Sequence, residues 1–191
     1  MFVYIAGNIA LDFCNTETKS RGETIELLNS VTDLKLWAEG AGLGLTNHKV
    51  LKKDLDNALD LRQAIKGLLA ARLAHEDPRQ SDIDTLNQYL VFPVAEQELK
   101  YTGGSFFIKK NVQQTIELLF AQIAQSATEV LLDGQKYTLK QCANPACILY
   151  FLDKSKTQQR KWCSMVICGN RLKVSNHHKR HKTLSDDEAA R

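Results

Sequence analysis

Two identically spaced pairs of cysteines constrain this chain more than any other feature of its sequence. Cys142 and Cys147 form one C-x4-C pair, and Cys163 and Cys168 form the other. Zn²⁺ prefers four soft ligands in a tetrahedron, and two such pairs supply them with little backbone strain. The spacing therefore predicts one structural zinc ion with no coordination position open for catalysis. Four reduced thiols without a metal, and disulfides, are the alternatives.

The fifth cysteine, Cys14, stands alone in an apolar segment, where we expect a buried and unreactive thiol. In a cytoplasmic protein, the clustering of the other four favours metal binding over disulfides. We expect a cytoplasmic location because the first residues lack the pattern of a signal peptide. In addition, the sequence contains no run of about 18 apolar residues that could span a membrane.

Basic residues are concentrated in the segment that contains the cysteine pairs. Residues 1–141 carry 15 lysines and arginines against 18 acidic residues, whereas residues 142–183 carry nine against one, Asp153. A short basic segment attached to a mildly acidic body indicates a polyanionic partner. A solvated basic face without a partner is the alternative.

The hydropathy pattern predicts an α+β fold in two parts. Residues 1–139 are expected to form a mostly helical domain with a small antiparallel sheet. Residues 140–183 are expected to form a small treble-clef-like zinc finger that ends in a basic helix, and residues 184–191 a tail. Because almost no linker separates the domain from the finger, we expect the two to pack together.

Apolar residues at three- and four-residue spacing, with turn residues between them, predict the individual elements. The predicted helices cover residues 23–29, 32–39, 49–74, 82–89 and 111–132. Gly103-Gly104 predicts the turn of a β-hairpin formed by residues 99–102 and 106–108. Residues 5–13 are predicted as a short strand or the start of a helix, residues 15–22 as a polar loop, and residues 137–139 and 148–152 as short strands.

The finger is expected to depend on its metal. Asn144-Pro145 favours a turn that points the first two thiols inward, and the second pair is predicted to open a helix. A module of about 40 residues cannot bury enough apolar surface to fold alone, so metal binding should supply most of its stability. The residues expected to form its small core are Trp162, Met165, Val166, Ile167 and Leu172.

Basic and amide side chains surround and follow the second cysteine pair. Lysine and arginine neutralise phosphates and asparagine can read base edges, so we expect nucleic-acid binding, with double-stranded DNA preferred. The residues expected to make these contacts are Lys154, Lys156, Arg160, Lys161, Asn170, Arg171, Lys173, Asn176, Lys179 and Arg180. RNA and an acidic protein are the alternative partners. His177 and His181 could share a helical face and hold a second metal ion, although solvated histidines are the simpler interpretation.

The motifs of the chain resemble those of a bacterial protein family. The CANPAC segment at residues 142–147, YFLDKS at 150–155, and WCSM at 162–165 followed by CGNR at 168–171 resemble the CGNR-type zinc finger. LDFCNT at residues 11–16 resembles the L-[DE]-[FL]-x-N-T opening of the ABATE domain, which precedes that finger in many bacterial proteins. The resemblance covers essentially the whole chain. It implies a stress-related transcriptional regulator whose finger contacts DNA, with the four clustered cysteines as zinc ligands.

The N-terminal domain is expected to sense a small-molecule effector, to form a homodimer, or both. Dimerisation would help because a single finger binds DNA weakly. The candidate lining of a ligand pocket is Asp12, Asn15, Thr16, Arg21 and Arg62, although Asn15 and Thr16 are also typical of loop and helix ends. No Gly-rich phosphate loop or nucleophile–base pair accompanies them, so we do not expect an enzyme.

Overall fold

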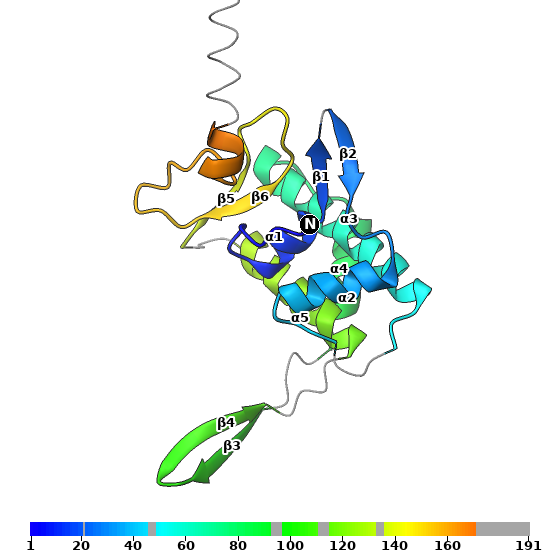
Figure 1. The fold of residues 1–191 in the computed structure, drawn as a ribbon, viewed down its shortest axis with the longest axis vertical. Helices are drawn as coiled ribbons and strands as arrows, with labels where there is room; N and C mark the ends of the chain where they lie inside the picture. The colour runs from blue at the N-terminus through cyan, green and yellow to red at the C-terminus, as the bar shows by residue number, and fades with distance from the viewer. Residues whose placement is uncertain (21, 46–48, 93–96, 111–114, 133–135, 171–191) are drawn as a thin grey trace, which may run out of the picture.

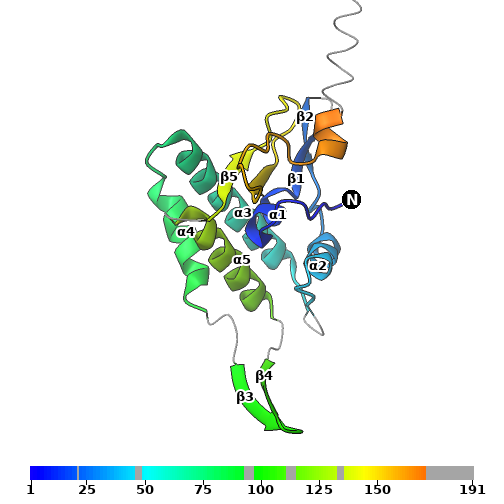
Figure 2. The same cartoon turned by 90° about the vertical axis from the view of Figure 1, so that its left-hand side faces the viewer.

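The computed structural model describes residues 1–20, 22–45, 49–92, 97–110, 115–132 and 136–170. Within these residues, helices are interspersed with short antiparallel hairpins, which confirms the predicted α+β class (Figures 1 and 2). None of the helices in this part of the chain has the length and apolarity that crossing a membrane requires.

The body of the protein is built from helices that pack around α1 (Ile9–Cys14). α3 (Lys52–Ala74), α4 (Gln80–Leu90) and α5 (Ile116–Leu131) pack against one another, and α1 packs on α3 and α5. α2 (Val31–Gly40) packs against α3, and its Trp37 ring lies 4.9 Å from the Phe13 ring, centroid to centroid. The helices predicted over residues 32–39, 49–74 and 82–89 are therefore present with small shifts at their ends. For the helix predicted from residue 111, the first residues lie outside the described part of the chain.

The segment after α1 forms a β-hairpin, so the predicted loop at residues 15–22 and helix at residues 23–29 are wrong. β1 (Glu17–Ser20) pairs with β2 (Glu23–Glu26), and Gly22 in the turn has a φ of +92°, which favours glycine. Local sequence favoured a helix over residues 23–29, but a distant contact decides the structure. Glu17 and Glu26 pair across the hairpin, and both meet the guanidinium of Arg62 on α3.

Arg62 is the charged centre of this contact, and its side chain is only 2% exposed. Its Nη1 donates to Glu26 Oε1 at 2.7 Å and to the Thr16 hydroxyl at 2.8 Å. Burial would raise the pKa of Glu26, but the hydrogen bonds from Arg62 and from the Leu28 backbone N–H, together with the charge of Arg62, hold that pKa below its usual range. The ion pair therefore fixes the hairpin to α3 in its charged form.

The predicted hairpin at residues 99–108 is confirmed as β3 (Gln97–Thr102) and β4 (Ser105–Lys110). Its two-residue turn has φ values of +58° at Gly103 and +81° at Gly104, the left-handed conformations that a tight hairpin turn requires. Figures 1 and 2 show that β3 and β4 project from the helical body on the side away from β5 and β6.

The C-terminal hairpin packs directly on the body, as the short linker predicted. β5 (Thr138–Gln141) pairs with β6 (Tyr150–Asp153), and β6 lies along α1. The side-chain amide of Asn15 donates to the Tyr150 carbonyl at 2.9 Å and accepts from the Tyr150 backbone N–H at 2.9 Å. Phe151 is fully buried in the hydrophobic core that the body and the C-terminal hairpin share.

We predict that Asn15→Ala loosens this junction. The substitution leaves both backbone groups of Tyr150 buried without a partner, so the free energy of unfolding should fall by about 2–4 kcal/mol. Urea unfolding of the zinc-loaded protein measures the change. Asn57→Ala, at an exposed position on α3, is the matched control and should shift stability by less than about 0.5 kcal/mol. Equal effects of the two substitutions would contradict the role given to Asn15.

Candidate metal centre

The sulfur atoms of the four clustered cysteines converge on one point. They all lie within 4.8 Å of one another, with Cys163 Sγ 3.5 Å from Cys168 Sγ and 3.8 Å from Cys147 Sγ. A tetrahedral zinc ion with Zn–S bonds of about 2.3 Å requires sulfur–sulfur separations of about 3.8 Å. All five cysteines of the chain lie in the described residues, and all are free. The donor set therefore fits one structural Zn²⁺, as the spacing predicted.

The first cysteine pair occupies the loop between β5 and β6. The Cys142 backbone N–H donates to the Leu149 carbonyl at 2.9 Å and thereby closes the hairpin. Within the loop, buried Asn144 accepts hydrogen bonds from two backbone N–H groups, one of Ala146 to its side chain at 3.0 Å and one of Cys147 to its carbonyl at 2.8 Å. These bonds form the turn that Asn144-Pro145 predicted and point both thiols to the same side.

The second pair frames a single π-helical turn, η1 (Met165–Gly169), shown in orange in Figure 1. Ser164 caps this turn by accepting the Ile167 backbone N–H at 3.3 Å. The Cys163 backbone N–H points at Cys142 Sγ, 3.5 Å away, and can stabilise a thiolate there. A Cβ atom at Gly169 would meet Trp162 Cδ1 at 3.2 Å, so glycine lets the indole lie against the turn.

Asp153 ties the loop between the two pairs to β6. Its fully buried carboxylate accepts hydrogen bonds from Lys140 Nζ at 2.7 Å, the Ser155 hydroxyl at 2.6 Å and the Arg160 backbone N–H at 2.7 Å. Burial would raise the pKa of Asp153, but these hydrogen bonds, led by that from Lys140, hold the pKa well below its usual range. The charged carboxylate therefore fixes both ends of the loop.

Arg160 connects this loop to the second cysteine pair. Its guanidinium lies 4.4 Å from the centroid of the Phe151 ring, and its Nε donates to the Trp162 carbonyl at 2.8 Å. Its Nη2 donates to the Cys163 carbonyl. Arg160 thus positions the third sulfur of the cluster, although the sequence indicated only a contact with nucleic acid.

The thiols interact strongly with one another. A hydrogen bond from Cys163 lowers the pKa of the Cys147 thiol to about 5. Donating that bond, together with burial, raises the pKa of Cys163 well above its usual value, and burial raises the pKa of Cys168 to about 11. Several negative charges in so small a space repel one another, and a divalent cation among the sulfurs removes that penalty.

The small core predicted for the finger is only partly present. Trp162 is half-buried against the shared core, but Met165, Val166 and Ile167 are 52%, 79% and 41% exposed, so the prediction is wrong for these three. The finger instead buries Leu149 and Phe151, from β6 and the residue before it, in the core that it shares with the body. Leu172 lies outside the described residues.

The residues predicted to contact nucleic acid divide into three groups. Lys156, Lys161 and Asn170 are exposed, and exposed Lys154 holds its Nζ 5.1 Å from the centroid of the Tyr137 ring. Arg160 is half-buried and engaged as described above. The others, together with the predicted basic helix, lie outside the described residues: Arg171, Lys173, Asn176, Lys179 and Arg180.

The described residues among those predicted to line a ligand pocket form hydrogen bonds within the protein. Asp12 accepts the Ala6 backbone N–H at 2.9 Å, and burial raises the pKa of its carboxyl to about 6 despite that bond. The Asn15 side chain is hydrogen-bonded to the backbone of β6, and the Thr16 hydroxyl accepts a hydrogen bond from Arg62. Arg21 lies outside the described residues. A ligand at this position stays a prediction, and the four described residues already have partners within the protein.

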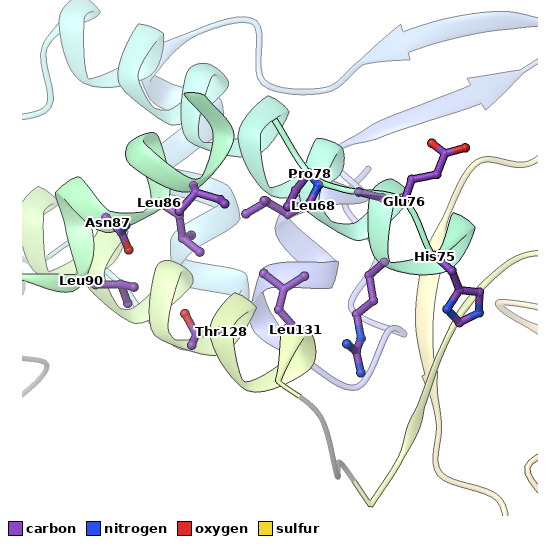
Figure 3. Close-up of a pocket in the computed structure, with 12 residues that line it drawn as sticks. Leu68, His75, Glu76, Pro78, Leu86, Asn87, Leu90, Thr128 and Leu131 are labelled. Carbon is purple, nitrogen blue, oxygen red and sulfur yellow. The ribbon is translucent and has the colours of Figure 1, made fainter. Parts of the chain in front are cut away.

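A hollow lies elsewhere on the body, between α3, α4 and α5 (Figure 3). It has a volume of about 460 Å³. Leu68, Leu86 and Leu131 come from the three helices and face this groove, while His75 and Glu76 lie at one end of it. The sequence predicted the three helices, but which of their leucines would be covered depends on how the helices pack.

Asp153 and Lys140 were not recognised from the sequence as parts of the metal centre. The available signal was that Asp153 is the single acidic residue among nine basic residues in residues 142–183. A single acidic residue in such a basic segment is expected to form an ion pair with a basic residue. Nothing in the sequence marked Lys140 as its partner.

Comparisons with known proteins find two family models that match successive parts of the chain. Residues 7–134 match the family ABATE, described as "Putative stress-induced transcription regulator". Residues 138–181 match the CGNR zinc finger. No curated protein matches the chain. The two matches confirm the resemblance that the sequence motifs indicated.

We predict that Cys163→Ser abolishes stoichiometric zinc binding. Purified protein should contain one zinc per chain by elemental analysis, and this variant well below half of that, because a structural site needs all four ligands. Hydrogen exchange should then lose protection over residues 142–168 while α3 and α5 remain protected. Cys14→Ser is the matched control and should keep its zinc. A variant lacking Cys163 that still holds stoichiometric zinc would refute the four-sulfur site.

Proposed function

Because the chain belongs to the ABATE family and ends in a CGNR zinc finger, we propose that it is a zinc-dependent, DNA-binding transcriptional regulator. The observation that carries the proposal is the loop at residues 154–161. It presents exposed Lys156 and Lys161 from a backbone that Asp153 and the metal centre hold in place.

The zinc ion has a structural role in this proposal. It would join the loop between β5 and β6 to η1, and the basic segment at residues 171–182 continues directly from η1. Lysine side chains on a fixed support neutralise phosphates and set the register of the protein on the duplex. Asn170 is exposed next to η1 and would read a base edge in this proposal.

We assign no catalytic step to the chain. A centre with four thiolates has no open coordination position, so the metal supports structure and not chemistry. The family description suggests a role in a stress response. Thiols that bind zinc stay reduced in the cytoplasm, where we place the protein.

We predict that the double substitution Lys156→Ala and Lys161→Ala weakens binding to duplex DNA about tenfold and lowers the salt dependence of log K by about 2. Fluorescence anisotropy of zinc-loaded protein on a random-sequence duplex measures both quantities. The variant should keep its zinc. Lys35→Ala with Lys53→Ala, two exposed lysines of the body, is the matched control and should leave both quantities unchanged.

Two further experiments distinguish this proposal from its alternatives. A structured RNA of equal length should compete less well than duplex DNA, and the reverse order would favour an RNA-binding finger. Arg160→Ala should lower zinc retention as well as DNA binding, since Arg160 positions Cys163. Binding that persists at high salt and ignores phosphate would indicate a protein partner instead.

The groove between α3, α4 and α5 is the best candidate for effector binding by the N-terminal domain. Ligand pockets are typically concave and mainly apolar with a few polar groups at the edge. The groove has this character, because leucines from three helices and Arg72 line it and His75 and Glu76 lie at one end. Its volume of about 460 Å³ suits a small and largely apolar molecule.

We predict that Ala71→Trp fills this groove. The apolar dye 1-anilinonaphthalene-8-sulfonate should bind the wild-type protein with increased fluorescence, and Ala71→Trp should weaken that binding about tenfold, because the new ring occupies the space of the dye. Ala70→Trp is the matched control, since Ala70 is the exposed neighbour of Ala71 on the same helix and does not line the groove. Equal fluorescence from all three proteins would contradict an effector site here.

A further inference from the structure

The β3–β4 hairpin carries a row of large apolar side chains that are open to solvent. Leu99, Tyr101, Phe106 and Ile108 are 63%, 63%, 71% and 50% exposed. Leu99 pairs with Ile108 and Tyr101 with Phe106, and directly opposed residues of an antiparallel ladder lie on the same face. We call these four residues the apolar hairpin face. Its two rings already pack together, with centroids 4.7 Å apart.

This face has no cover from the rest of the described chain. Figures 1 and 2 show β3 and β4 standing clear of the helices, on the side away from the metal centre. An isolated two-stranded hairpin is only marginally stable in water, and its strands normally gain stability by packing one face on another surface. A contiguous exposed apolar patch on a projecting element is typical of an interaction site.

The chemistry of the face identifies the kind of partner. None of its four side chains is charged, so a nucleic-acid duplex, which presents phosphates, or a strongly charged protein would find no ion-pairing group on it. The surface that matches it best is another uncharged, flat, aromatic-rich surface of the same width. Another copy of the hairpin supplies that surface at equal concentration, and two identical patches close into a twofold dimer without leaving a free face.

The area is sufficient for such a pair. A fully exposed large apolar side chain offers about 150–250 Å², so the four residues at their observed exposures offer about 500 Å² per copy. Two faces in contact bury about 1,000 Å², the lower limit for a specific interface. We propose that two copies of this chain pair face to face through Leu99, Tyr101, Phe106 and Ile108.

The location of the hairpin makes this pairing compatible with DNA binding. Because the hairpin and the metal centre lie on different sides of the body, a dimer held at the hairpins leaves both fingers uncovered. When two fingers are linked, binding of the first to DNA raises the effective concentration of the second there, and the overall affinity increases. The pairing itself does not rest on the proposed function, since it can be measured without any nucleic acid.

The test is sedimentation equilibrium of the zinc-loaded full chain between about 1 and 200 μM, a range suited to an interface of this size. The wild type should dimerise with a micromolar Kd. Phe106→Lys should raise the Kd at least about a hundredfold, since it sets two ammonium groups against each other across the twofold axis. Phe107→Lys places the same substitution on the opposite face of β4, where Phe107 is 45% exposed, and should leave the Kd unchanged.

Zinc content and circular dichroism of each variant establish that it is folded, and Leu99→Lys provides a second substitution on the same face. A wild type that stays monomeric at the highest concentration would overturn the pairing. A dimer that survives both Phe106→Lys and Leu99→Lys would do the same, because the copies would then meet elsewhere. Equal weakening by Phe107→Lys and Phe106→Lys would also reject the assigned face.

Discussion

The structure depends on strand β6, which belongs to the body and to the finger at once. Phe151 of this strand lies in the core beneath the helices, while its neighbours Tyr150 and Leu152 form backbone hydrogen bonds with Asn15 and Ala6. A metal module of this size cannot bury a core of its own. Because β6 packs against the body, the segment that carries the sulfur atoms is anchored to an apolar core. The metal centre and the N-terminal domain therefore share one hydrophobic core.

Two buried charges hold the segments that the apolar core does not reach. Arg62 gathers Thr16 and the two glutamates of the β1–β2 hairpin, and Asp153 gathers the loop between the cysteine pairs. Each charge is neutralised by several hydrogen bonds, and this is the condition under which a buried ion stabilises a fold. The same principle thus holds the β1–β2 hairpin against α3 and the loop between the cysteine pairs against β6.

Features set by local sequence could be predicted, and features set by distant contacts could not. The cysteine spacing gave the sulfur cluster, apolar periodicity gave α3, and Gly103-Gly104 gave the β3–β4 turn. The β1–β2 hairpin was missed because it depends on Arg62, far along the chain. Exposure of Met165, Val166 and Ile167 was missed because the finger buries the apolar residues of β6, and not those of η1, in the core that it shares with the body. The partners of Asp153 became apparent only once β5 and β6 were paired.

The connection between α4 and α5 has a consequence for how this protein can vary. The Tyr89 ring near the end of α4 lies 5.2 Å from the Phe120 ring in the first turns of α5, centroid to centroid. The chain therefore leaves the helical body and returns to it at nearly the same place. The free energy of closing such an excursion rises only slowly with its length. The β3–β4 hairpin at residues 97–110 can accordingly be shortened, extended or exchanged for a foreign segment with little effect on the helices, as long as Thr115 remains to cap α5.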